Sequence, residues 1–277
     1  QLTVKYFKGS AMIFKTSQGD WDLIIPSNHH TVVLKMSGGA DSAIMGYCMA
    51  LYKKKERPDL KIIIATTNGF APKTWHIRYA NQVCDKITEL TGVDFSDRHQ
   101  NQMIVPEIMY RGSDFIEEIK LSNYDKAQKE NEKNIMAREG DDAKQKTIWY
   151  NGTTANPPRS EKLFYEDYHK GFDTPNVMGH TECTVEEASN LYERDPEVKR
   201  RESGTKAGYR MWAIPFNNKD KKFIAELYKN LGVLDSLFPL TRSCENNQHY
   251  LPDPNNEKHC EKCWWCLERY WGFGRYV

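Results

Sequence analysis

Short runs of β-branched and aliphatic residues form the most regular part of the hydrophobic pattern in this chain. Residues 31–34 form one such run, and residues 60–67 form a second. Runs of this length are typical of strands buried on both faces of a sheet. Between them, apolar positions recur at helical spacing from residue 44 to residue 51. Strand, helix and strand within about 35 residues predict a βαβ unit, and hence an α/β fold with a parallel sheet.

The rest of the pattern predicts three parts of the chain. Residues 1–30 hold short apolar runs separated by turn residues, which predict a β-rich flap with strands at Leu2–Phe7, Ala11–Phe14 and Trp21–Ile25. Residues 31–240 form the main α/β domain. Residues 241–277 form a cysteine-rich segment that we expect to pack on this domain.

Two polar insertions interrupt the main domain, at residues 113–146 and 160–209. The first has helical character with a narrow apolar face, and it predicts either an exposed helical pair or a lid over the site. The second is the least regular part of the chain and carries a capping-box pattern at residues 184–187. The other elements predicted in this domain are helices at Trp75–Thr91 and Lys219–Leu231, strands at Thr147–Tyr150 and from residue 211, and a short segment at Asp94–Arg98.

Composition narrows the class of protein. The 277 residues carry a net charge of +1, so no long-range field attracts nucleic acid, and we do not expect nucleic acid as a partner. The sequence shows no apolar run of about 18 residues and no signal-peptide pattern, so we expect a cytoplasmic protein that does not bind a membrane. Seven cysteines are an odd number, and four of them lie near the C-terminus, which favours metal binding over disulfides.

A glycine turn separates the first core strand from the helix that follows. Its sequence is Ser37-Gly38-Gly39-Ala40-Asp41-Ser42. A strand, a glycine turn and a helix direct backbone N–H groups and the positive end of the helix at an anion, and glycines let the backbone approach a phosphate. Asp41 would repel phosphate unless a cation lies between them, which indicates Mg²⁺. The alternative is an ordinary glycine-rich βα turn without a ligand.

This hexapeptide resembles the S-G-G-x-D-S signature of the PP-loop ATP pyrophosphatases. The resemblance implies an adenine nucleotide alpha-hydrolase-like fold, with a doubly wound parallel sheet, and a loop that binds the β- and γ-phosphates of ATP while a substrate oxygen attacks the α-phosphate. It implies that the end of the second strand holds the adenosine and that a second glycine turn lies near the α-phosphate, where Arg159 could bind a phosphate or a carboxylate. The nucleotide-binding residues are then Met36, Ser37, Gly38, Gly39, Ala40, Asp41, Ser42, Thr66, Thr67, Asn68, Gly152 and Thr153. The alternative for the second turn is a surface loop that ends at proline.

The cysteines near the C-terminus have the spacing C-x₁₅-C-x₂-C-x₂-C. Four thiolates form a closed tetrahedral Zn²⁺ site, which is structural rather than catalytic. An iron–sulfur cluster is the alternative, because thiolates also bind iron. The ligands in either case are Cys244, Cys260, Cys263 and Cys266. Trp264 and Trp265, between two of the ligands, could stack on a planar base or pack over the metal.

The glycine turn and the cysteines together resemble the 7-cyano-7-deazaguanine synthase family. The similarity covers the first core strand and helices and residues 211–275, including Pro215-Phe216 with Lys219, Leu231-Gly232, Thr241-Arg242-Ser243-Cys244, and Arg269 ahead of Gly272-Phe273. It implies a zinc-containing homodimer of queuosine biosynthesis that makes preQ0 from 7-carboxy-7-deazaguanine, ATP and ammonia. The chain departs from the family in its A-N-P-P-R segment, where the family has an acidic and aromatic one, and in its large polar insertions, so we expect a divergent member that acts on this acid or a related one.

We therefore expect an ATP-dependent ligase that adenylates a small-molecule carboxylate and converts it with ammonia, releasing AMP and pyrophosphate. The catalytic candidates are Asp41, Ser42, Lys219 and Arg159. Lys219 could equally be an exposed lysine in the first turn of a helix. Two other hypotheses use the same motifs: an enzyme of tRNA thiolation or sulfonucleotide reduction, and a binding module that keeps ATP and zinc without catalysis.

Overall fold

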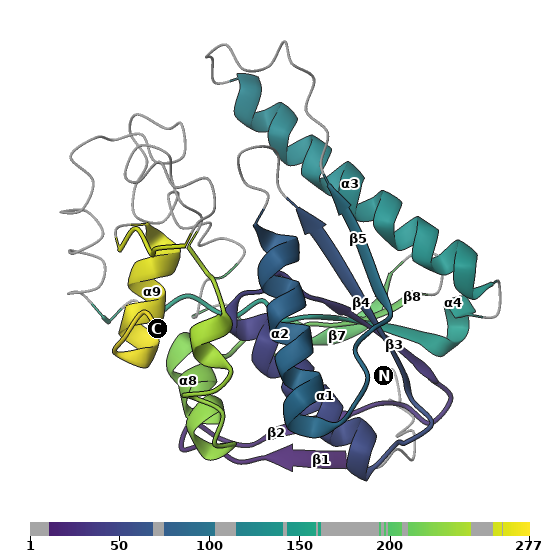
Figure 1. The fold of residues 1–277 in the computed structure, drawn as a ribbon, viewed down its shortest axis with the longest axis horizontal. Helices are drawn as coiled ribbons and strands as arrows, with labels where there is room; N and C mark the ends of the chain where they lie inside the picture. Colours follow the sequence, from purple (N-terminus) through teal and green to yellow (C-terminus); the bar gives the residue numbers. More distant parts are fainter. Residues whose placement is uncertain are drawn as a thin grey trace.

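The computed structural model describes residues 11–68, 75–102, 115–140, 143–158, 160–161, 194, 197, 199–206, 210–244, 257–261 and 263–277. A six-stranded sheet in the order β5-β4-β3-β6-β8-β7 lies at the centre of this part of the chain (Figure 1). The sheet is parallel except for the pairing of β7 with β8. Its strands are β3 (Thr31–Lys35), β4 (Lys61–Asn68), β5 (Arg98–Gln102), β6 (Thr147–Asn151), β7 (Ser203–Lys206) and β8 (Arg210–Ala213). The expected α/β class with a mostly parallel sheet is confirmed.

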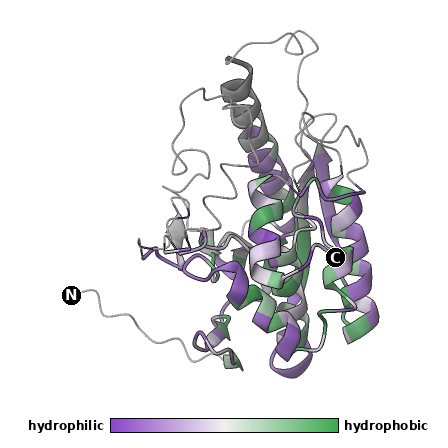
Figure 2. Cartoon of the chain, turned by 90° about the vertical axis from the view of Figure 1, so that its left-hand side faces the viewer, coloured by the Kyte–Doolittle hydropathy of each residue, from purple (hydrophilic) through white to green (hydrophobic). Residues whose placement is uncertain are grey.

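Helices cover both faces of the sheet. Alternate residues of β3 and β4, such as Val32 and Ile62, face a core formed with α1 (Ala40–Lys55), α2 (His76–Thr91) and α8 (Lys221–Asn230). The residues between them, such as Val33 and Ile63, face the opposite way and pack with Ile135 of α3 (Phe115–Glu139). Hydrophobic and hydrophilic residues alternate along the helices, as expected for helices with one face on a sheet (Figure 2).

Local backbone conformation and hydrogen bonds explain where α2 ends and where the next strand begins. Gly92 ends α2 in the left-handed conformation, with φ of 73°, and its N–H bonds to the carbonyl of Thr88. The strand after α2 begins at Arg98, where the predicted short segment ends, because residues 94–96 form a turn instead. In that turn the Asp94 carboxylate accepts hydrogen bonds from the backbone N–H and the hydroxyl of Ser96, each at 2.8 Å.

The first polar insertion is helical as predicted. Its main element is α3, which ends before Gly140, and the short α4 (Ala143–Lys146) leads into β6. Asn131 in α3 donates to the backbone carbonyls of Thr66 and His99, both at 3.2 Å, so this helix is fixed across β4 and β5. Since α3 packs on the sheet through buried Ile135, it is part of the core layer rather than an exposed helical pair.

The N-terminal and C-terminal parts add smaller elements. β1 (Ala11–Phe14) and β2 (Trp21–Ile24) form an antiparallel hairpin, close to the predicted strands; the predicted strand at residues 2–7 lies outside the described residues. A 3₁₀ turn, η2 (Phe238–Leu240), precedes α9 (Trp264–Phe273). The hydrophobic pattern does not predict α9, nor does it predict β7, which lies inside the second insertion and pairs with β8.

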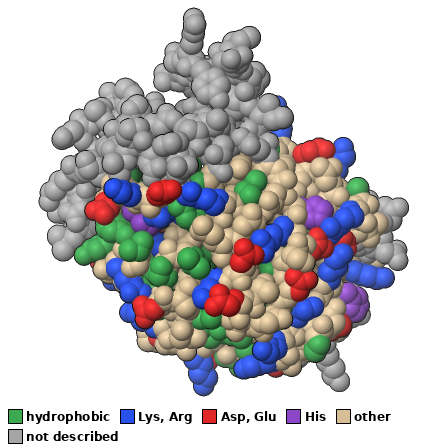
Figure 3. Space-filling model, in the orientation of Figure 1, with side chains coloured by type: hydrophobic (Ala, Val, Ile, Leu, Met, Phe, Trp, Pro, Cys, Tyr) green, Lys and Arg blue, Asp and Glu red, His purple; other side chains and the backbone are tan. Residues whose placement is uncertain are grey.

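The described surface carries charges of both signs. Basic and acidic side chains are interspersed over the face shown in Figure 3, in line with the net charge of +1 for the whole chain. Within the described residues, no helix combines the length and the apolar character that a membrane span requires.

Candidate functional site

A cleft opens at the carboxyl ends of β3 and β6, where the strand order of the sheet reverses. From β3 the chain continues to β4 and β5 on one side, whereas β6 and β8 lie on the other. Ligands of open parallel sheets bind at such switch points. The cleft has a volume of about 290 Å³. Residues from both glycine turns, from α3 and from the cysteine segment line it, among them Lys35, Ser37, Gly39, Asp41, Ser42, Thr67, Glu132, Gly152, Thr153, Lys221, Arg242 and Trp265.

The first glycine turn is shaped by Gly38. Its φ of +79° is unfavourable for residues with a side chain. A Cβ at this position would lie 2.5 Å from the Cβ of Tyr79 and 2.8 Å from the backbone N of Ala80, so α2 also leaves no room for one. The Ser42 hydroxyl closes the turn by accepting from the Ser37 N–H at 3.3 Å and donating to the Gly39 carbonyl at 3.1 Å. The turn thus leads directly into the N-terminus of α1, an arrangement suited to binding an anion.

The second glycine turn lies against the start of the same helix. Asn151, the last residue of β6, accepts hydrogen bonds from the backbone N–H and the hydroxyl of Thr153, at 3.1 and 2.9 Å. A Cβ on Gly152 would lie 2.9 Å from the backbone N of Ser42 and 3.0 Å from the Asp41 carbonyl carbon. The absence of a side chain at position 152 therefore allows the two turns to form one continuous wall.

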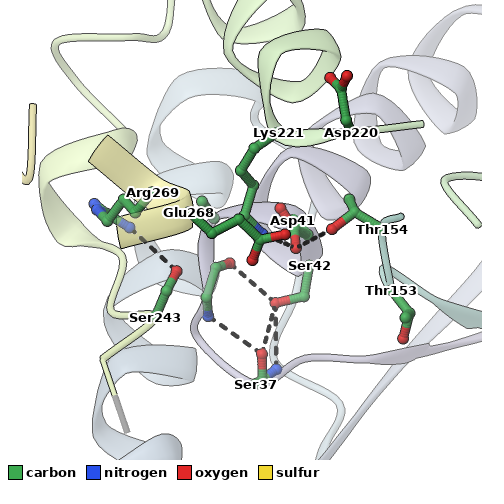
Figure 4. A network of polar contacts seen from close by, with 12 residues as sticks. Ser37, Asp41, Ser42, Thr153, Thr154, Asp220, Lys221, Ser243, Glu268 and Arg269 are labelled. Carbon is green, nitrogen blue, oxygen red and sulfur yellow. Dashed lines mark hydrogen bonds and ion pairs between the residues drawn. The ribbon is translucent and has the colours of Figure 1, made fainter. Parts of the chain in front are cut away.

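A network of charged side chains lies next to these turns (Figure 4). The Asp41 carboxylate forms an ion pair with Lys221, the first residue of α8, and accepts a hydrogen bond from the Thr154 hydroxyl at 3.3 Å. The Lys221 ammonium also lies 3.7 Å from the Glu268 carboxylate on α9, and Glu268 forms a second ion pair with Arg194. Lys221 and Glu268 are almost completely buried, at 4% and 0% side-chain exposure.

The lysine in this network is not the one expected from sequence. The ammonium of Lys219 lies 5.0 Å from the centre of the Phe223 ring, and Lys219 is not among the residues that line the cleft. Lys221 reaches Asp41 because Asp220 caps α8, accepting from the backbone N–H groups of Lys222 and Phe223 at 2.9 and 3.0 Å. The preference of aspartate for N-caps is the sequence signal that could have placed the helix start here.

The other predicted site residues fall into two groups. Met36, Ser37, Gly39, Asp41, Ser42, Thr67, Gly152 and Thr153 line the cleft, while Gly38 and Ala40 shape the turn and the start of α1. Thr66 donates from its hydroxyl to the Met36 carbonyl at 2.8 Å, and the Asn68 side chain accepts from the Ile77 N–H at 2.8 Å, so both are engaged within the fold. Arg159 lies outside the described residues. Glu268, Arg194 and Thr154 were not predicted, because nothing local marks them.

The four cysteines of the C-terminal segment come together as expected. The sulfur atoms of Cys244, Cys260, Cys263 and Cys266 all lie within 4.8 Å of one another, and all four residues are buried. A tetrahedral site with Zn–S bonds of about 2.3 Å has sulfur atoms about 3.8 Å apart. The Cys260 and Cys266 sulfurs are 3.8 Å apart. The cluster could therefore hold a metal ion such as zinc.

Arg269 and Arg242 attach the cysteine segment to the rest of the fold. The fully buried Arg269 guanidinium donates to the Thr241 hydroxyl at 2.9 Å and to the carbonyls of Phe238 and Tyr276 at 3.1 and 2.7 Å. Burial lowers the pKa of Arg269 to about 9. The backbone N–H of Arg242 donates to the carbonyl of Gly38 at 2.8 Å, so the cysteine segment directly contacts the first glycine turn.

A smaller cavity of about 120 Å³ adjoins the cleft on the α3 side of the sheet. Trp149 and Trp212, which are paired neighbours on β6 and β8, both line it. Lys35 and Glu132 border both this cavity and the main cleft and form an ion pair at 2.8 Å. The combined space therefore has glycine turns at one end and an aromatic surface at the other.

Comparisons with known proteins leave the function to be argued from this geometry. No protein-family model matches the chain, and no curated protein matches its sequence significantly.

Proposed function

We propose that this chain is an ATP pyrophosphatase of the PP-loop type that ligates a carboxylate with ammonia. In this reaction the carboxylate attacks the α-phosphate of ATP, pyrophosphate leaves, and ammonia displaces AMP to give an amide; a second activation gives a nitrile. The acid that we propose is 7-carboxy-7-deazaguanine or a related deazapurine. The observation that carries the proposal is the close apposition of the S-G-G-A-D-S turn and the Gly152 turn at the switch point of a parallel sheet.

The first turn has the features that phosphate binding requires. Gly38 and Gly39 leave its backbone without side chains, and the N–H groups in the first turn of α1 have no partner within the helix. The Ser37 and Ser42 hydroxyls lie beside them, 3.2 Å apart. Lys221 adds a positive charge next to the turn. These groups would stabilise the negative charge that develops on the departing pyrophosphate.

Asp41 fits a role in binding Mg²⁺. Its Oδ2 atom faces Lys221 and Thr154, whereas its Oδ1 atom is buried and has no hydrogen-bond partner among the described residues. Carboxylate oxygens are preferred ligands of Mg²⁺. When bound, Mg²⁺ would neutralise charge on the phosphates. The four cysteines offer no open coordination position to a substrate, so zinc there would serve the structure of the segment.

The adjoining cavity supports a planar acid as the second substrate. The indoles of Trp149 and Trp212, which both line this cavity, suit a flat heteroaromatic ring, which gains from stacking on aromatic faces. Lys35, at the border with the main cleft, supplies a positive charge for a carboxylate. A ring bound over the tryptophans would direct its carboxylate toward the glycine turns.

The test measures AMP and pyrophosphate release from Mg·ATP and ammonium, with and without 7-carboxy-7-deazaguanine. Release that depends on the acid, with an amide or nitrile product detected by mass spectrometry, would support the proposal. Release that depends on tRNA instead would favour the thiolation hypothesis. Reduction of a sulfonucleotide to sulfite by a thiol reductant, without pyrophosphate release, would favour the reductase hypothesis. ATP binding without release in the presence of any of these acceptors would favour a binding module.

A further inference from the structure

Glu268 brings a fully buried negative charge from the cysteine segment to the cleft. It lies on α9, two residues after the ligand Cys266, and its side chain has 0% exposure. Each of its oxygens faces a different cation: Oε1 forms the ion pair with Arg194, and Oε2 lies 3.7 Å from the Lys221 ammonium. A single carboxylate thus connects two cations that come from distant parts of the chain.

Each of these two cations also contacts a residue in or next to one of the two glycine turns. Lys221 forms an ion pair with Asp41 of the first turn. Arg194 donates to Thr154, next to the second turn, through Nε to its carbonyl at 2.8 Å and through a terminal nitrogen to its hydroxyl at 3.2 Å. Figure 4 shows the Glu268, Lys221 and Asp41 side chains next to one another, with Thr154 beside Asp41. The position of Glu268 therefore affects both walls of the cleft.

Stability alone does not explain this arrangement. Transferring charged groups from water to the interior costs several kcal/mol per ion, and well-packed apolar residues often replace a buried ion pair without loss of stability. Among the described residues, removing only Glu268 would leave the positive charges of Lys221 and Arg194 with Asp41 as the one remaining carboxylate in an ion pair with either of them. A buried lysine held between two carboxylates has fewer orientations than a lysine with one partner, so its ammonium is already in place when an anion enters.

We propose that Glu268 is a positioning residue that holds Lys221 and Arg194 at the phosphate-binding walls of the cleft. Through Glu268 the cysteine segment sets the affinity of the cleft for pyrophosphate and for the phosphates of ATP. The inference rests on the proposed function where it concerns nucleotide, and on the observed contacts where it concerns the placement of Lys221.

The first test measures binding of Mg·ATP and of magnesium pyrophosphate by calorimetry. Glu268→Gln keeps the shape of the side chain and removes its charge, and it should raise both dissociation constants at least about tenfold, since hydrogen bonds to charged groups contribute more than neutral ones. The matched control is Glu161→Gln. It removes the charge of the exposed Glu161 carboxylate, which lies 3.2 Å from the ammonium of Lys222, the neighbour of Lys221 on α8. This substitution should leave both dissociation constants unchanged.

A double-mutant cycle separates positioning from general support of the fold. If Glu268 acts in part through Lys221, then Glu268→Gln should weaken pyrophosphate binding clearly less in a Lys221→Met background than in wild type, and the remaining loss reports its contact with Arg194. Fully additive losses would overturn the inference, as would wild-type affinity in Glu268→Gln. If that variant does not fold, Glu268→Asp, which keeps the charge and retracts the carboxylate, takes its place with the same expected direction.

The second test does not depend on nucleotide. Acetylation of lysines by acetic anhydride, followed by mass spectrometry, reports how firmly Lys221 is held, with exposed Lys222 as the internal standard. Lys221 should react several-fold faster in Glu268→Gln than in wild type. Unchanged Lys221 labelling overturns the positioning role even if nucleotide binds. Faster labelling in a protein that binds neither ATP nor pyrophosphate would support the positioning role and refute the proposed function.

Discussion

Replacing Gly152 by alanine tests whether the two glycine turns form one functional wall. The added Cβ would meet three backbone atoms of Asp41 and Ser42, at 2.9–3.0 Å. Real Cβ atoms are rarely closer than 3.4 Å to such neighbours, so one turn has to retreat by roughly 0.4–0.5 Å. Backbone atoms cannot rotate away as the end of a flexible side chain can. The strain therefore acts on the contact between β6 and α1.

The expected cost follows from that geometry. Inserting a methyl group into a well-packed contact typically costs about 1–3 kcal/mol, and we expect Gly152→Ala to lower the free energy of unfolding by an amount in this range. The larger effect should be on ligand affinity, because the turn that moves lies beside Asp41 and the start of α1. We expect Mg·ATP and pyrophosphate to bind at least about tenfold more weakly, which corresponds to about 1.4 kcal/mol.

Urea unfolding and calorimetric titration with Mg·ATP measure these two quantities. Gly92→Ala is the control: it has a φ of +73° with no atom within 4 Å of the added Cβ, far along the chain from both turns. It should cost about 1–2 kcal/mol in stability through its backbone alone and leave nucleotide affinity unchanged. Unchanged affinity in Gly152→Ala, together with unchanged stability, would refute the close apposition of the turns.

Three further predictions concern a carboxylate, the metal and the effect of pH. Asp41→Asn should abolish AMP formation while the circular dichroism spectrum stays that of wild type; retained turnover would rule out its role. Cys263→Ser should lose the bound metal, measured by elemental analysis, and lower the midpoint of thermal unfolding; full metal content would contradict the four-cysteine site. Burial, and then the charges of His30 and Arg57, lower the pKa of His29 in the fold, so the unfolded chain takes up this proton first and stability should fall as pH drops below about 6.5. In urea unfolding between about pH 7.5 and 5.5, His29→Gln should show a smaller decline than wild type, and an equal decline would contradict this account.

The parallel core could be predicted because its signals are local. The run at residues 31–34 lies within β3, the run at residues 60–67 overlaps β4 in all but its first residue, and the glycine after Trp75–Thr91 ends α2. The C-x₂-C-x₂-C spacing likewise places three thiols close together along the chain. The fourth ligand candidate, Cys244, precedes them with 15 residues in between. In each case a few adjacent residues carry the information. The coarse fold and the clustering of the four cysteines were accordingly predicted correctly.

The charged network could not be predicted, because its partners are distant in sequence. Lys221 meets Asp41 across 180 positions, and Arg194 meets Glu268 across 74. On sequence alone Lys221, Arg194 and Glu268 resemble ordinary charged surface residues; only Asp41 carries a local signal. The position of Lys221 depends on where α8 begins, which the Asp220 cap decides; Lys221 is the first residue of the helix, whereas Lys219 lies before the cap and outside it. β7 escaped prediction for a different reason: its partner β8 is close in sequence, but the residues of β7 have no apolar pattern.

A second charge cluster in the molecule shows why the network at the cleft is unusual. Near the amino ends of β4 and β5, four charged side chains form ion pairs that attach the end of α3 to the sheet: Lys61, Asp97, Arg138 and Glu139. The side chains of the basic members of that cluster, Lys61 and Arg138, remain 42–46% exposed, so water still hydrates their charges. Lys221 and Glu268 have almost no such contact. The same fold thus builds an ion-pair network at low desolvation cost at one end of the sheet and at high cost at the other. Since the costly one lies next to the two glycine turns, its charges are best explained by the polyanionic ligand that we propose for the cleft, with which Lys221 would interact directly.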